Sequence, residues 1–107
     1  MDRQFIEYFR DKLVDLNGKL GEKTERIENA IEGENVLEEL KTIFLEIDDD
    51  FKNMCYDVFE KAEASEEWKE NEEMFSKIHL VLEDVKENII QLKYEILNLI
   101  VPNFMAA

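Results

Sequence analysis

The sequence is poor in the residues that make tight turns, disulfides and metal sites. Its 107 residues include one cysteine, one histidine, one proline and three glycines. A lone cysteine excludes an internal disulfide framework, and a lone histidine excludes the usual multi-histidine metal and catalytic sites within one chain. So few glycines and prolines argue against a sheet of many short strands, because such sheets need many turns. We therefore expect few, long elements and an all-α fold.

The sequence also has no long hydrophobic run and little positive charge. Its longest apolar runs are about as short as Leu99-Ile100-Val101, far from the roughly 20 residues that a membrane span needs. The first residues alternate charged and apolar side chains, which is unlike a signal or transit peptide. Against 13 Lys and Arg stand 27 Asp and Glu, a formal charge of −14 that anionic lipids and nucleic-acid phosphates would repel. We expect a cytoplasmic protein that binds neither membranes nor nucleic acid directly.

What the sequence does contain is hydrophobic periodicity. Hydrophobic residues make up 45% of the chain, too many for an acidic disordered tail. They recur at heptad positions a and d in three segments, which predicts helices at about 3–32, 36–63 and 66–101. The a positions are Ile6, Leu13, Leu20 and Ile27 in the first, Leu37, Phe44, Phe51 and Val58 in the second, and Phe75, Leu82, Ile89 and Ile96 in the third. The d positions include Phe9, Leu16 and Ala30, then Leu40, Ile47 and Met54, then Ile78, Val85, Leu92 and Leu99, with Lys23 as the one interruption.

Short connections between helices of similar length force sequence neighbours to run antiparallel. The sequence thus predicts an antiparallel three-helix bundle, up-down-up, that forms a single domain over residues 1–107. Pro102 is expected to stop the last helix and leave a short flexible tail, because proline lacks a backbone donor. Asn17-Gly18 and Gly21 leave one alternative open. A break at Gly18–Gly21 would give a four-helix variant, although the heptad phase continues across the site.

The predicted helix ends have local signals. Asp2 can cap the first helix, and Gly33 stands where a left-handed C-terminal cap is expected. Asn35 followed by Glu38 is typical of a capping box, in which each side chain accepts a backbone hydrogen bond. The heptad phase changes between the second and third segments, and Ser65 is a serviceable cap, so we expect a turn near 62–65.

Negative charge is concentrated in the second half of the chain. Residues 1–33 carry a net charge of −2, residues 34–64 carry −7 and residues 65–107 carry −5. An electronegative surface attracts basic proteins, and an aromatic residue among charges can anchor the contact. The candidate partner-binding residues are Asp48, Asp49, Asp50, Glu63, Glu66, Glu67, Trp68 and Glu70. The alternative is that these charges serve only solubility.

The chain offers little for catalysis. Successive helical residues fan out by about 100°, so Asp48, Asp49 and Asp50 cannot converge on one cation, and the spacing of a calcium loop is absent. Cys55 and His79 fall at flanking heptad positions, where we expect Cys55 to be a small packing residue and His79 to be half-buried at the edge of the core. No glycine-rich phosphate loop, nucleophile elbow or paired metal-ligand motif occurs in the sequence. We expect no catalytic, cofactor or metal site, and hence not an enzyme.

These observations favour a small acidic protein-binding domain of the inhibitor, immunity or antagonist type. Its partner would be a basic protein, including one that normally holds nucleic acid, in which case the chain would act as a nucleic-acid mimic. The alternative is a structural coiled-coil assembly subunit or chaperone-like adaptor. Apolar residues outside positions a and d, such as Leu80, Ile90 and Leu97, leave self-association into a homo-oligomer open.

Overall fold

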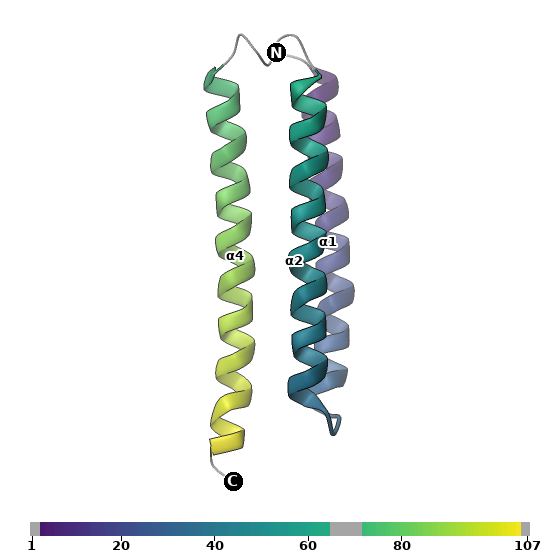
Figure 1. The fold of residues 1–107 in the computed structure, drawn as a ribbon, viewed down its shortest axis with the longest axis vertical. Helices are drawn as coiled ribbons and strands as arrows, with labels where there is room; N and C mark the ends of the chain where they lie inside the picture. Colours follow the sequence, from purple (N-terminus) through teal and green to yellow (C-terminus); the bar gives the residue numbers. More distant parts are fainter. Residues whose placement is uncertain (1–2, 65–71, 106–107) are drawn as a thin grey trace. The chain divides into compact units, whose positions relative to one another are not determined.

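The computed structural model describes residues 3–64 and 72–105, and it is helical throughout these ranges except at the turn around Gly33 and at Ala64. The helices are α1 (Arg3–Ile31), α2 (Val36–Glu63) and α4 (Glu72–Met105), drawn in Figure 1. No strand occurs among these residues. The prediction of an all-α chain with three long helices is confirmed.

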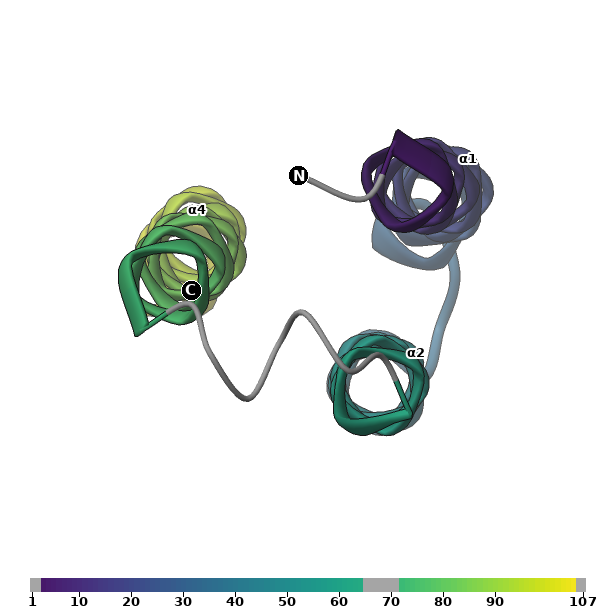
Figure 2. The same cartoon turned by 90° about the horizontal axis from the view of Figure 1, so that it is seen from above.

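Helices α1 and α2 pack against each other as an antiparallel hairpin. Seen along their length in Figure 2, the two helices lie side by side and are joined by the short turn around Gly33. In this turn the Gly33 N–H donates to the Ala30 carbonyl at 3.0 Å. The short connection therefore imposes the opposite directions that the sequence predicts.

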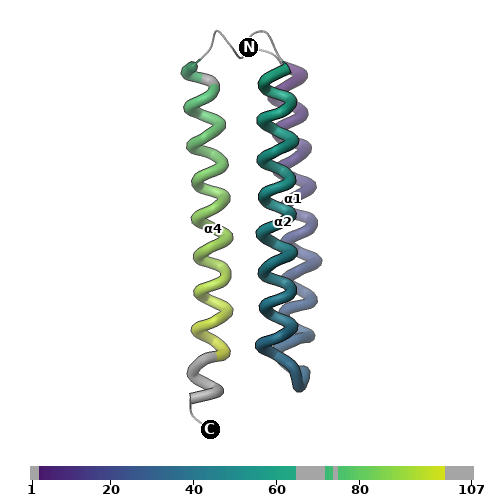
Figure 3. Tube along the Cα trace, viewed as in Figure 1, coloured from purple at the N-terminus to yellow at the C-terminus, as the bar shows by residue number. Residues whose placement is uncertain are grey.

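Helix α1 is continuous through its two glycines, as the trace in Figure 3 shows. Neither Gly18 nor Gly21 has a positive φ, so the Asn17-Gly18 pair does not form the turn that its composition allows. Two interior glycines cost a helix about 1 kcal/mol each, which packing along a 29-residue helix can offset. The four-helix alternative is wrong.

The caps at the hairpin turn differ from the predicted ones. Gly33 does not adopt the left-handed conformation, so the expected left-handed cap is wrong. Asn35 is the N-cap of α2, as predicted, but its side chain makes no capping hydrogen bond. Its φ of −107° and ψ of 50° lie outside the β region that a capping side chain requires. Its backbone carbonyl instead accepts the Glu39 N–H at 3.0 Å, which starts the helix.

The end of α2 at Glu63 matches the predicted turn. Ala64 is the C-cap, and its N–H donates to the Glu60 carbonyl at 3.2 Å. The described part of α4 begins at Glu72, and the predicted helix start at residue 66 lies outside the described residues, as does the expected cap Asp2. Glu72 and Glu73 occupy the first turn of α4, where carboxylates favour the positive end of the helix dipole.

The prediction that Pro102 stops the last helix is wrong, because α4 continues to Met105. Proline removes only its own N–H donor and crowds the preceding turn, at a cost of about 3 kcal/mol in a helix interior. The residues that follow it keep their donors, so hydrogen bonding resumes beyond it. Residues 106–107 lie outside the described range.

The buried side chains of the hairpin follow one stripe on each helix. These are Phe5, Phe9, Leu16, Ile27 and Ala30 of α1, and Leu40, Ile43, Ile47, Met54, Val58 and Ala62 of α2.

Four residues that the heptads place in a seam are instead exposed, one of them Phe75, at 38%. The exposed fraction is 45% for Ile6, 57% for Leu37 and 67% for Leu99. A strict seven-residue spacing drifts by about 20° per heptad around a straight helix. Residues at one end of a heptad row therefore lie far around the helix from its buried centre. Near Leu99, the low-exposure position is taken by Ile100, at 3%.

The chain divides into two compact units, Met1–Phe75 and Ser76–Ala107. The first unit holds the α1/α2 hairpin, and the second holds most of α4. The packing of the third helix in the predicted bundle, and the single domain over 1–107, stay predictions.

Candidate functional site

Three ion pairs cross the hairpin, each from a base on α1 to an acid on α2. Lys12 Nζ donates to Asp57 Oδ2 at 3.0 Å, Lys23 Nζ lies 3.5 Å from Asp50 Oδ2, and Arg26 donates to Glu46. As the residue number rises on α1 it falls on α2, which is the pattern of antiparallel helices. The three pairs therefore help to set how the two helices align.

The Lys23–Asp50 pair is the least exposed of the three. The exposed fractions of its side chains are 15% and 21%. The Asp50 Oδ2 atom is buried and has no hydrogen bond, so its contact with Lys23 is an ion pair without hydrogen-bond geometry. Lys23, which interrupts the apolar heptad of α1, thus holds the opposing carboxylate of α2. Removing either partner would leave the other charge poorly solvated.

The Lys12–Asp57 pair extends to an aromatic ring. The ammonium groups of Lys12 and Lys61 each lie 5.4 Å from the centre of the Tyr8 ring, within range of a cation–π attraction. The hydrogen bond from Lys12 to Asp57 raises the pKa of the lysine above its ordinary value, since the carboxylate favours the charged ammonium. The charged groups of Lys12, Lys61 and Asp57 therefore contact other groups of the hairpin.

The three adjacent aspartates that are predicted to bind a partner have different surroundings. Asp50 faces α1 and pairs with Lys23, whereas Asp48 and Asp49 are exposed. Glu63, also predicted, is the exposed last residue of α2. The remaining predicted residues, Glu66, Glu67, Trp68 and Glu70, lie outside the described residues.

One face of α2 brings together acidic and apolar side chains that are all exposed, and we call it the outer α2 stripe. It consists of Glu38, Leu45, Asp49, Tyr56, Glu60 and Glu63. At 100° per residue, these positions fall within about 60° of one another, on the side of α2 opposite its buried stripe. Leu45 is 57% exposed and Tyr56 is 64% exposed.

The carboxylates of the outer α2 stripe have no cation in the described part of the chain. Glu38, Asp49, Glu60 and Glu63 form no ion pair there, whereas five bases of α1 are each paired with an acid. The only bases on α2 itself are Lys41, Lys52 and Lys61, and the Lys52 ammonium lies 5.9 Å from the centre of the Tyr56 ring. Five of the six bases of α1 are thus in ion pairs within the hairpin, whereas the carboxylates of the outer α2 stripe face outward.

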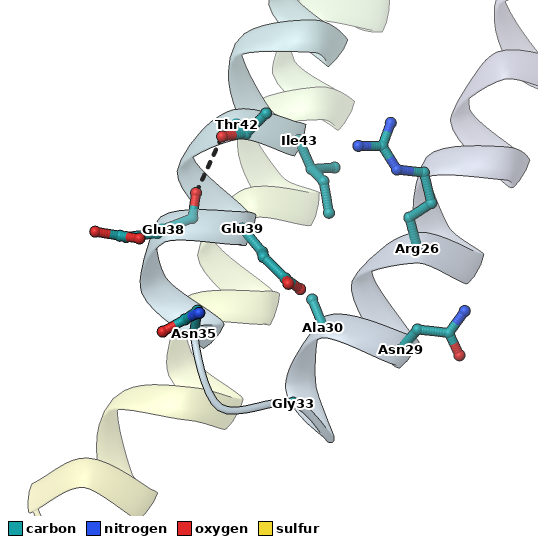
Figure 4. Close-up of a pocket in the computed structure, with 9 residues that line it drawn as sticks. All are labelled: Arg26, Asn29, Ala30, Gly33, Asn35, Glu38, Glu39, Thr42 and Ile43. Atoms are coloured by element: carbon teal, nitrogen blue, oxygen red, sulfur yellow. Dashed lines mark hydrogen bonds between the residues drawn. The ribbon is translucent and has the colours of Figure 1, made fainter.

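A cleft of about 650 Å³ opens at the turn end of the hairpin (Figure 4). Ala30 and Ile43 lie between the helices, and Thr42 Oγ1 donates to the Glu38 carbonyl at 3.1 Å. Arg26, which also lines the cleft, is held by Glu46. The lining has neither histidine nor cysteine, and the described residues contain no cluster of His, Cys, Asp and Glu that could hold a metal ion. We assign no chemistry to this cleft.

Cys55 and His79 differ in their surroundings. Cys55, predicted to be a small packing residue, is half-buried, and burial raises the pKa of its thiol, which favours the protonated form. His79 is exposed, so its predicted half-buried position is wrong. At 100° per residue, His79 lies about 80° around the helix from the centre of the least exposed face of α4. Its heptad position alone does not give this angle.

The sequence interpretation missed the cross-helix ion pairs, although two signals for them were present. Lys23 interrupts an otherwise apolar heptad row, and Asp50 and Asp57 are seven residues apart on the flank of the next row. Charges that flank the seams of neighbouring helices commonly pair across the interface. The outer α2 stripe could likewise have been found by placing exposed acids and apolar residues on a helical projection.

None of the described helices is both long enough and apolar enough to span a membrane. Comparisons of the whole chain give no family assignment, since no family model, no curated protein and no solved structure matches it. The chain's own surface is therefore the basis for any statement about function.

Proposed function

We propose that this chain is a small, non-catalytic acidic protein that binds a basic protein through the outer α2 stripe. The observation that carries the proposal is the difference between the basic side chains of α1 and the acidic side chains of the outer α2 stripe. Five of the six bases of α1 are in ion pairs, while the stripe carboxylates have no ion-pair partner among the residues that the structure describes. Such a surface attracts a positively charged partner and speeds its encounter.

The stripe also has the mixed chemistry of an interface. Tyr56 and Leu45 are exposed apolar side chains among carboxylates, and aromatic residues with charged neighbours are frequent energetic centres of protein contacts. The predicted residues Asp49 and Glu63 lie on this stripe, and Glu38 and Glu60 extend it. In this proposal Tyr56 has the anchoring role that the sequence suggested for Trp68.

The proposed mode of action is occlusion. A basic partner surface covered by these carboxylates is no longer accessible to its own anionic ligand, so the chain acts as an inhibitor or antagonist. Where the partner surface normally holds nucleic acid, the spaced carboxylates of α2 take the place of phosphates. No catalytic step is needed for this activity.

The first experiment is affinity capture from the host extract at about 50 mM salt, followed by elution with a salt gradient, because screening weakens contacts between exposed charges. A basic protein that elutes at moderate salt is the expected result. Its binding to the purified chain is then measured by titration, with the fluorescence of Trp68, the single tryptophan, as a second signal. Recovery of no basic protein would overturn the proposal.

Two triple variants locate the binding surface. The variant Asp49→Asn/Glu60→Gln/Glu63→Gln removes three stripe charges, and we expect it to raise the dissociation constant for the captured partner at least about tenfold. The matched control, Glu22→Gln/Glu25→Gln/Glu28→Gln, removes three exposed charges from α1 and changes the net charge equally. An equal loss of affinity in both variants would mean that net charge alone drives binding and that the stripe is not the site.

A further inference from the structure

The last part of the chain is nearly free of charge. Residues 88–107 include one base, Lys93, and one acid, Glu95, and so have no net charge in a chain of −14. The preceding residues 76–87 contribute −1, which leaves most of the acidity before Ser76. Two copies of this chain repel each other wherever their acidic parts meet, but the uncharged end of α4 can approach its counterpart without that cost.

This end of α4 has apolar residues on more than one side. The least exposed side chains of α4 are Ile78, Leu82, Ile89, Ile96 and Ile100. A second row is formed by Ile90, Tyr94 and Leu97, with spacings of four and three residues, and Val101 continues this spacing in the sequence. At 100° per residue, the second row is centred about 100° around the helix from the first. Such a row is the pattern of a helix–helix seam.

The second row is accessible at Ile90 and Tyr94, whereas Leu97 is half-buried. Ile90 is 42% exposed and Tyr94 is 61% exposed. On the side of the row away from the least exposed side chains stand the amides Gln91 and Asn98, with Glu87 one turn before Gln91. Gln91 donates to Glu95 within the helix at 3.4 Å, and the uncharged amide of Asn98 can donate to and accept from an identical surface without like-charge repulsion. A symmetric dimer requires this kind of self-complementary surface.

We propose that the chain self-associates through the row Ile90, Tyr94 and Leu97 of α4, which packs against the same row of a second copy. The contact is apolar and amide-lined, and it is separate from the outer α2 stripe that binds the basic partner in the proposed function. The two surfaces respond oppositely to salt. Added salt weakens the acidic contact by screening and preserves or strengthens the apolar one.

The test is sedimentation equilibrium of the full chain over a range of concentrations up to about 100 µM, at low and at high salt. We expect a reversible monomer–dimer equilibrium that high salt does not weaken. The variants Ile90→Glu and Tyr94→Glu should raise the dimer dissociation constant at least about tenfold, because each places a charge in the seam. The matched control Leu45→Glu adds the same charge at an equally exposed leucine of α2 and should leave the dimer intact, apart from a small general repulsion.

Far-UV circular dichroism of each variant checks that its helix content is unchanged, which the exposure of Ile90 and Tyr94 leads us to expect. A wild-type chain that stays monomeric at all concentrations would overturn the proposal. So would a dimer that Ile90→Glu, Tyr94→Glu and Leu45→Glu weaken equally. Since the dimer test uses no partner and the stripe test uses no dimer variant, failure of one proposal leaves the other standing.

Discussion

The α1/α2 hairpin and α4 share the same heptad spacing of apolar residues, but they use charge in different ways. In the hairpin, bases and acids lie beside the apolar rows and pair across the two helices, as Lys23 does with Asp50. In the C-terminal half of α4, charge is nearly absent, and the polar contact between Gln91 and Glu95 stays within the helix. Charges beside an apolar seam determine which helix can pack against it and how the two helices align. At an uncharged seam, the shape and the apolar area of the two surfaces determine the partner.

The comparison depends first on which side of α2 is buried. The heptad places Leu37 in the seam, whereas the structure buries Ile43 at 3% exposure and leaves Leu37 at 57%. We expect Ile43→Ala to lower the free energy of unfolding by about 3 kcal/mol, through lost burial and the cavity left behind. Leu37→Ala should change it by about 0.5 kcal/mol. Urea denaturation measures both, and the reverse order would show that the heptad, not the structure, identifies the core.

The Lys23–Asp50 pair can be tested by a double-mutant cycle. Asp50→Leu and Lys23→Leu should each cost about 1–2 kcal/mol because each leaves the opposite charge poorly solvated. Replacing both residues by leucine should restore most of the lost stability. The control Asp49→Asn, one residue away and exposed, should stay within about 0.5 kcal/mol of wild type. Losses that simply add in the double variant would mean that the pair does not couple the two helices.

The continuity of α1 can be tested by replacing Gly18 and Gly21. A Cβ atom at Gly18 or Gly21 would meet no atom within 4 Å. Alanine at either site should therefore raise the free energy of unfolding by about 1 kcal/mol, since alanine favours the helix and restricts the unfolded chain. Thermal melts monitored by circular dichroism measure the gain. A loss of stability in both variants would be the signature of a chain that needs a flexible joint there.

The smallest expected effect is the pH dependence from the Lys12–Asp57 pair. The folded-state pKa of Lys12 is raised, so its contribution to stability is fully present below the ordinary lysine pKa of about 10.4 and is lost as the pH rises through the folded value. Wild type should thus lose more stability than Lys12→Met between neutral and strongly alkaline pH. Urea titrations at both pH values compare them, and identical slopes would remove the assigned role of the pair.

Part of the proposed site follows from the sequence, but its arrangement does not. The excess of acid in residues 34–64 predicts a basic partner, which stays a prediction, and of the predicted residues Asp49 and Glu63 lie on the outer α2 stripe. Asp50 has a different position from the one its neighbours suggested, because consecutive helical residues point about 100° apart and the one that faces a neighbouring base pairs with it. Glu38 and Glu60 were missed because they are separated from the dense Asp48–Asp50 run along the sequence and join its face only through the helix repeat.

The sequence by itself determined the three helical segments and the ends of α1 and α2. Apolar periodicity, scarce glycine and proline, and the phase change after Val58 are local signals, and they set α1, α2 and the turn at Ala64 correctly. Only the tertiary structure decided which face of each helix is buried, that Lys23 meets Asp50, and that α1 runs unbroken through Gly18 and Gly21. The physical reason is that a heptad row drifts around its helix and each interior glycine weakens a helix by about 1 kcal/mol, so the contacts with the partner helix settle which face is buried and whether the helix continues.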